Sequence, residues 1–260
     1  MLQTRPSWPR QRLDELRAEV RAMEHGCARK KGAVLSFGID EMDRRLYGGG
    51  LAVGGLHEIS AAAPRPSDEA AATLFAAGIA ARQAGGKGTV LWVLCRRDLF
   101  APGLSQAGLP PERLLYAECR GQEEALAAME EGLRLGGLAA VVAEASRFSM
   151  TAARRLQLTA EASGTMALIL RSRRRMDDDP LATPSAALTR WRIASVPSQE
   201  MAVADVERSR WRIELARQRG GEPYSWIMEG SDAKGCLALP AVPAHRASEA
   251  PGGEVRPAAA

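Results

Sequence analysis

The chain has 260 residues, of which 46% are hydrophobic and 25% are charged, and its formal net charge is +4. This length and composition are ordinary for one soluble globular domain with extensions. The small positive excess permits contact with nucleic acid but does not demand it.

The spacing of cysteines, histidines and apolar residues indicates the cellular compartment and whether a metal site is expected. The four cysteines (Cys27, Cys95, Cys119, Cys236) have no CxxC spacing, and the three histidines are also scattered, so neither a disulfide framework nor a metal site is expected. No apolar run approaches the roughly 18 residues that span a bilayer. Residues 1–32 are charged throughout and do not resemble a secretory signal. We therefore expect a reduced, cytoplasmic protein.

Residues 1–32 predict an N-terminal amphipathic helical extension. Leu13, Leu16, Val20 and Met23 are separated by three, four and three residues, which places them on one face of a helix. Such a face either packs on the domain surface or docks onto another protein or subunit.

From residue 33, short apolar segments alternate with helical ones. The expected strands are residues 55–60, 89–94, 114–117, 139–143 and 166–170. The expected helices are residues 68–84, 121–135 and 150–163, with a short turn near residues 98–107. This alternation predicts an α/β fold with a mostly parallel sheet flanked by helices.

The pattern changes in the last third of the chain. Residues 187–195 and 210–218 both contain RWRI with alternating buried-type side chains, and residues 220–228 supply a turn and another strand. These segments predict an antiparallel C-terminal extension at the sheet edge. Residues 241–260, rich in Ala, Pro and Gly, predict a disordered tail.

The segment FGIDEMDRRLYGGGLAVGGLHEI resembles the opening of the RecA fold. It combines a turn, a Gly-rich loop and a strand that ends in Glu-Ile. The matching positions are residues 37–40, Leu46, residues 48–51, Gly54, Glu58 and Ile59. The similarity covers roughly residues 33–240 and implies a RecA-like domain over that range.

Within RecA-like proteins, the two RWRI stretches and the aromatic strand after RWRIELARQRGG resemble the ImuA family. These are RecA-like accessory proteins of bacterial damage-induced mutagenesis cassettes, related to the cell-division inhibitor SulA. The resemblance implies a role in SOS translesion DNA synthesis, with an ImuB-like protein and an error-prone DNA polymerase as partners. RecA is a further candidate partner. Two alternatives remain: a SulA-like inhibitor that binds FtsZ, and an atypical ATP-dependent recombination protein.

The expected phosphate-binding loop is missing from the first strand-to-helix turn. RecA-type ATPases carry GxxxxGK[ST] there, because glycines let backbone N–H groups surround the phosphates and the lysine reaches them. This chain has neither glycine nor lysine in the turn, and two prolines remove N–H donors. We expect Ser67 to cap the next helix, and Asp68 and Glu69 to offset its positive end. The degenerate loop comprises Ala61, Ala62, Ala63, Pro64, Arg65, Pro66, Ser67, Asp68 and Glu69.

The acidic positions of an ATPase are also weakly represented. Glu144 ends a hydrophobic strand where a RecA-like ATPase holds Mg²⁺, but it is equally a solvated or Arg-paired carboxylate. After the second strand the residues are Cys95, Arg96, Arg97 and Asp98, and only Asp98 could activate water. The interpretation is a pseudo-ATPase with no catalytic residue, no metal and no cofactor. His57, inside an apolar strand, is expected to be structural.

Four arginines follow the strand MALIL where RecA-like proteins open a DNA-contacting loop. We treat Arg171, Arg173, Arg174 and Arg175 as candidates for contact with DNA or a partner, through phosphate binding in the first case. Three aspartates follow at once and no aromatic residue lies between Phe148 and Trp191, so a solvated or salt-bridged loop is the alternative. About two dozen residues follow Glu144 before the next strand, too few for the longer insertion of RecA recombinases. We therefore expect any DNA contact to be weak or indirect.

Overall fold

The computed structural model describes residues 33–173, 175–197 and 208–240. The predicted N-terminal helix and C-terminal tail lie outside the described residues. The helices and strands, in chain order, are β1 (Val34–Leu35), α2 (Asp40–Asp43), β2 (Leu51–Ala52), β3 (Leu56–Ala61), α3 (Pro66–Ala84), β4 (Val90–Leu94), α4 (Ala101–Gln106), the 3-10 turn η1 (Pro111–Arg113), β5 (Leu114–Glu118), α5 (Gln122–Leu135), β6 (Ala140–Glu144), α6 (Met150–Ser163), β7 (Met166–Arg171), β8 (Thr189–Val196), β9 (Arg210–Gln218) and β10 (Tyr224–Glu229).

One eight-stranded sheet forms the centre of the molecule, in the order β10-β9-β8-β3-β7-β6-β4-β5. The strands from β8 to β5 run parallel, and β9 and β10 extend the sheet antiparallel beyond β8. The predicted mostly parallel α/β fold with an antiparallel C-terminal edge is therefore confirmed. The five strands β3, β4, β5, β6 and β7 match the predicted ones to within one residue at each end.

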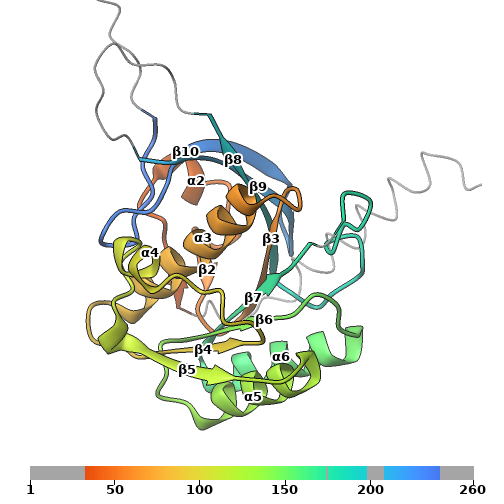
Figure 1. The fold of residues 1–260 in the computed structure, drawn as a ribbon. Coiled ribbons are helices and arrows are strands. Elements are labelled where there is room, and N and C mark those ends of the chain that lie inside the picture. The colour runs from red at the N-terminus through yellow and green to blue at the C-terminus, as the bar shows by residue number, and fades with distance from the viewer. Residues whose placement is uncertain (1–32, 174, 198–207, 241–260) are drawn as a thin grey trace, which may run out of the picture.

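Helices cover both faces of the sheet (Figure 1). α3 packs against β8, β3, β6, β7 and β4 on one face, whereas α5 and α6 pack against each other and against the opposite face. Each face therefore has its own apolar cluster. Because both sides of the central strands are buried, β3 and β7 are inaccessible along their whole length.

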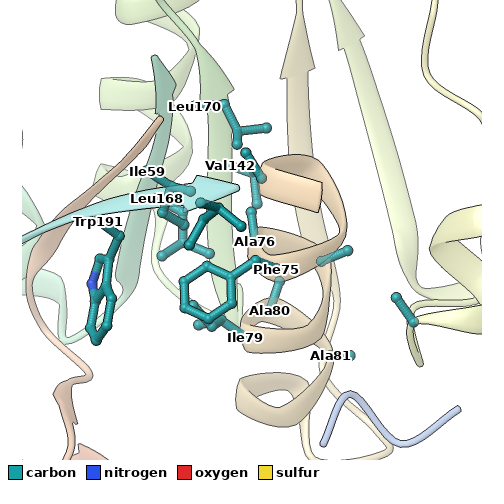
Figure 2. Close-up of a cluster of buried hydrophobic side chains, with 14 of the residues drawn as sticks. Ile59, Phe75, Ala76, Ile79, Ala80, Ala81, Val142, Leu168, Leu170 and Trp191 are labelled. Atoms are coloured by element: carbon teal, nitrogen blue, oxygen red, sulfur yellow. The ribbon is translucent and has the colours of Figure 1, made fainter. Parts of the chain in front are cut away.

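Aromatic side chains fill the interface between α3 and the extended sheet. Figure 2 shows the ring of Phe75 on α3 beside the indole of Trp191 on β8. The centroids of the two rings are 5.6 Å apart. Trp191 also approaches Phe37 and Trp226, at 5.9 and 6.3 Å. Such tilted aromatic pairs stabilise beyond their buried area, so the C-terminal strands are an integral part of this core.

The backbone geometry of the Gly-rich loop at residues 48–50 requires glycine. Gly48 and Gly49 have φ values of 86° and 83°, in the left-handed region that favours glycine. A Cβ on Gly50 would lie 2.5 Å from the carbonyl oxygen of Leu35, so only glycine permits the close approach to β1. The Gly-rich motif thus shapes the connection before β3.

No helix in residues 33–173, 175–197 and 208–240 is both long and apolar enough to cross a membrane.

Candidate functional site

The turn between β3 and α3 uses much of its backbone hydrogen-bonding capacity internally. The N–H of Ala62 donates to the carbonyl of Ile193 on β8 at 2.7 Å, and the N–H of Arg65 donates to the carbonyl of Ala63 at 2.8 Å. The two prolines of the turn have no N–H. The N–H groups of Asp68 and Glu69 both donate to the carbonyl of Arg65, at 3.0 Å. A phosphate nest needs several convergent donors, so this turn is poorly suited to an anion.

The start of α3 differs from the sequence prediction. Its N-cap is Arg65 and its first residue is Pro66, so the prediction that Ser67 caps the helix is wrong. Proline is favoured at this first position because its missing N–H would be unpaired there anyway. Asp68 lies in the first turn as expected, but its buried carboxylate accepts a hydrogen bond from the N–H of Ser195 on β8, at 2.9 Å. The side chain therefore fastens α3 to β8 rather than capping the amides of its own helix.

A pocket of about 320 Å³ lies at the carboxyl ends of the strands, beside the first turn of α3. This is the edge of an α/β sheet where ligands usually bind. Its lining includes the acidic side chains of Glu69 and Glu144 and the basic side chains of Arg96, Arg120 and Arg171. The lining residues are Ile59, Ala61, Glu69, Ala72, Thr73, Cys95, Arg96, Arg120, Gly121, Gln122, Glu144, Ala145, Ser146, Leu170, Arg171 and Ser172.

Glu144 lies in this pocket at the end of β6, as the sequence suggested. Burial raises the pKa of its carboxyl group, and the charge of Asp98 raises it further, while Arg96 opposes the shift. Asp98 itself pairs with Arg96 at 3.3 Å on the surface, so the one acidic candidate after β4 has a cation beside it. In the described residues, no three His, Cys, Asp or Glu side chains gather as a metal site would require.

Arg171 is a buried residue at the end of β7, which argues against the prediction that it contacts DNA or a partner. Its side chain is 1% exposed and donates to Glu58 Oε2 at 3.1 Å. Arg190 on β8 reaches the same oxygen at 3.0 Å, so one buried carboxylate on β3 joins β7 and β8. The guanidinium of Arg171 also lies 4.5 Å from the ring centroid of Phe148. Burial lowers the pKa of Arg171, and the carboxylate of Glu58 opposes that change.

Two other arginines of the run have partners inside the protein. Arg173 donates to the carbonyl oxygens of Ala62, Arg175 and Met176, so it closes over the degenerate turn. Arg175 pairs with Asp177 at 3.2 Å. Arg174 lies outside the described residues.

The aspartates after the run mostly pair with arginines elsewhere. Asp178 forms an ion pair with Arg147 at 2.9 Å, and Asp179 forms one with Arg192 of β8 at 2.7 Å. Arg192 in turn bonds Glu214 of β9 at 2.7 Å. These contacts fit the salt-bridged loop that the sequence left open as an alternative. They do not test whether the segment contacts DNA.

Sequence reasoning missed the buried triad of Glu58, Arg171 and Arg190. Glu58 was noted as part of the opening motif and Arg190 as part of an RWRI stretch, but nothing linked the two. The carboxylate of Glu58 inside a predicted buried strand was the available signal, because a buried charge needs a partner.

The fold and the degenerate turn together define a RecA-like protein. The crystal structure of the RadB recombinase matches with a TM-score of 0.56 over 80% of this chain and 100% of that chain, at 15% sequence identity, and thus supports the fold alone. No family model matches the sequence.

Curated relatives identify the family within this class. Protein ImuA of Caulobacter vibrioides strain NA1000/CB15N is 39% identical over 223 residues, covering 81% of this chain and 88% of the relative. Protein ImuA of a second strain, ATCC 19089/CIP 103742/CB 15, matches identically and adds no independent comparison. The chain belongs to the ImuA family.

Proposed function

We propose that this chain is a non-catalytic RecA-like accessory protein in DNA-damage-induced translesion synthesis. It acts through contacts with an ImuB-like protein of the polymerase family and with an error-prone DNA polymerase. Membership in the ImuA family supports the biological role, and the turn between β3 and α3 supports the absence of catalysis.

The proposal that the protein is non-catalytic rests on the turn between β3 and α3, whose polar groups form hydrogen bonds within the protein. Ala62 bonds β8, the side chain of Arg173 covers its carbonyl, and Asp68 fastens the first turn of α3 to β8. A triphosphate in the pocket would meet the carboxylate of Glu69, which lines it, and few convergent N–H donors. Like charges at close range disfavour such binding.

A nucleotide titration tests this part. The full chain is titrated with a fluorescent ATP analogue and Mg²⁺, with and without single-stranded DNA, and ATP hydrolysis is followed in parallel. We expect no saturable binding at millimolar nucleotide and no hydrolysis above background. Hydrolysis that Glu144→Ala abolishes would overturn the proposal and favour the ATP-dependent recombination protein instead.

The outermost strand β5 is a suitable surface for partner contact. Among residues 33–173, 175–197 and 208–240, β5 pairs with β4 alone, so one of its edges has no strand partner there. Leu115 and Tyr116 on this strand are 54% and 45% exposed. Unpaired edges with apolar side chains readily accept a strand from another chain. We assign this edge to the ImuB-like partner.

Two matched variants test the edge. Leu115→Glu should weaken binding to the ImuB-like protein at least tenfold, whereas Leu158→Glu on the outer surface of α6, at a residue 55% exposed, should leave it unchanged. Both variants should keep the wild-type circular dichroism spectrum. Equal binding by both variants would refute the edge assignment. Capture of FtsZ together with failure to bind the ImuB-like protein and the polymerase would refute the whole function and favour a SulA-like inhibitor.

A further inference from the structure

Cys95 and Cys119 are distant in sequence but adjacent in the sheet. β4 and β5 are parallel neighbours with Val93 opposite Ala117 and Leu94 opposite Glu118. The N–H of Cys119 donates to the carbonyl of Leu94 at 2.9 Å, which carries the same register one residue past the strands. Cys95 is therefore opposite Cys119. Neighbouring strands lie about 4.8 Å apart, and disulfides join Cα atoms separated by about 4.4–6.8 Å.

Both thiols point to the same face of the sheet. Side chains alternate along a strand, and Val93 and Ala117, two residues before the cysteines, lie on the α5 side. Cys119 is buried in the same cluster, and Cys95 packs against it. Burial raises the pKa of Cys119, and the charges of Glu124 and Cys95 raise it further, which is consistent with this shared face.

The two cysteines differ in access to solvent. Cys95 is partly exposed and lines the pocket at the carboxyl ends of the strands, whereas Cys119 is 9% exposed and is not part of the lining. A small oxidant in the pocket reaches Cys95 first, and Cys119 is then placed to resolve the oxidised sulfur. Both are free thiols in this structure.

We propose that Cys95 and Cys119 form a reversible disulfide on exposure to a peroxide. The thiolate of Cys95 attacks a peroxide oxygen, the O–O bond breaks, and hydroxide leaves as Cys95 becomes a sulfenic acid. The thiolate of Cys119 then attacks the sulfenic sulfur, forming the S–S bond and releasing a second hydroxide. The protons lost by the two thiols convert both hydroxides to water, so two thiols and one peroxide give one disulfide and two waters.

The surroundings of the pair make this reaction depend on pH. Burial raises the pKa of both thiols. The carboxylates of Glu144 and Glu124 raise that of Cys95 further, and Arg96 opposes them. Because the thiolate is the nucleophile, oxidation is slow at neutral pH and accelerates about tenfold per pH unit below the pKa. The Cys95–Cys119 disulfide would link the carboxyl ends of β4 and β5, next to Arg96 and Arg120, which line the pocket.

Peptide mapping tests the proposal directly. The reduced full chain is treated with hydrogen peroxide, the remaining thiols are alkylated, and the protein is digested with trypsin without reductant. The digest separates the two cysteines cleanly, because residues 88–96 and 114–120 form tryptic peptides with one cysteine each. We expect these two peptides to be joined, with the loss of two hydrogens, and separated again by a reducing agent.

Three controls decide the outcome. Cys119→Ser should abolish the linked pair and leave Cys95 as a sulfenic acid that dimedone traps, whereas Cys236→Ser should leave the linked pair unchanged. Oxidation in urea should give mixed pairings among all cysteines, because the register is then lost. Failure of the folded protein to give the linked peptides, or a pairing no more selective than in urea, would overturn the proposal.

Discussion

Acid should destabilise this protein through one buried histidine, His57. Its imidazole is 1% exposed, with Nε2 2.9 Å from the carbonyl oxygen of Ala52 and Nδ1 2.8 Å from Thr189 Oγ1. A carbonyl only accepts, so Nε2 carries the proton and Nδ1 accepts from the threonine hydroxyl. Trp191 Nε1 donates to the same hydroxyl oxygen at 2.6 Å. A second proton on Nδ1 would therefore face the hydroxyl hydrogen.

The size of the effect follows from the pKa. Burial lowers the pKa of His57 from 6.5 to about 4, although the bond to Ala52 opposes the shift. The folded state thus binds fewer protons than the unfolded state between these values, and stability falls as pH falls. The full loss of stability is about 3 kcal/mol well below pH 4, and about 2 kcal/mol of it occurs between pH 7 and pH 5.

Urea denaturation at pH 7 and pH 5 measures the effect in wild type and in His57→Gln. Glutamine can still donate to Ala52 but does not titrate. We expect the free energy of unfolding to fall about 2 kcal/mol more in wild type than in the variant over this interval. Each protein is compared with itself at pH 7, so any stability that the variant loses through poorer packing is present at both pH values and cancels. Equal losses in the two proteins would refute the reasoning.

Three further substitutions test the buried and partly buried charges. Glu58→Gln should lower the free energy of unfolding by about 3–5 kcal/mol, because it leaves Arg171 and Arg190 buried without an anion. Replacing Glu58, Arg171 and Arg190 together with Met should recover much of this loss. A triple variant as unstable as Glu58→Gln would contradict this account. Glu144→Gln should stabilise the protein at pH 7, because burial disfavours the charged carboxylate of the wild type. The gain should disappear below pH 4.5, the ordinary pKa of a glutamate carboxyl group, where the carboxyl is neutral in both the folded and the unfolded state. A gain in stability that persists in acid would exclude burial of the charge as its cause. Asp68→Ala should cost about 1–3 kcal/mol, since it leaves a main-chain N–H of β8 unpaired, and thermal unfolding that matches wild type would argue against the fastening role.

Much of the fold follows from local patterns along the chain. Short apolar runs separated by helical periodicity predict the central strands to within one residue, because each strand's burial depends mainly on its own composition. The end of α3 was also predictable, since Gly85 adopts φ = 55° just after the last helical residue. The start of α3 was misjudged because serine is a common N-cap and the proline before it was assigned to the turn.

The sequence by itself determined that the phosphate-loop position lacks lysine and glycine, because that is a property of consecutive residues. Only the tertiary structure decided what those residues do instead. Asp68 reaches β8, Arg171 turns inward to Glu58, and Cys95 lies opposite Cys119. Each contact depends on the lateral order of strands that are far apart along the chain. Hydrophobic periodicity encodes which face of a strand is buried, but not which strand lies beside it.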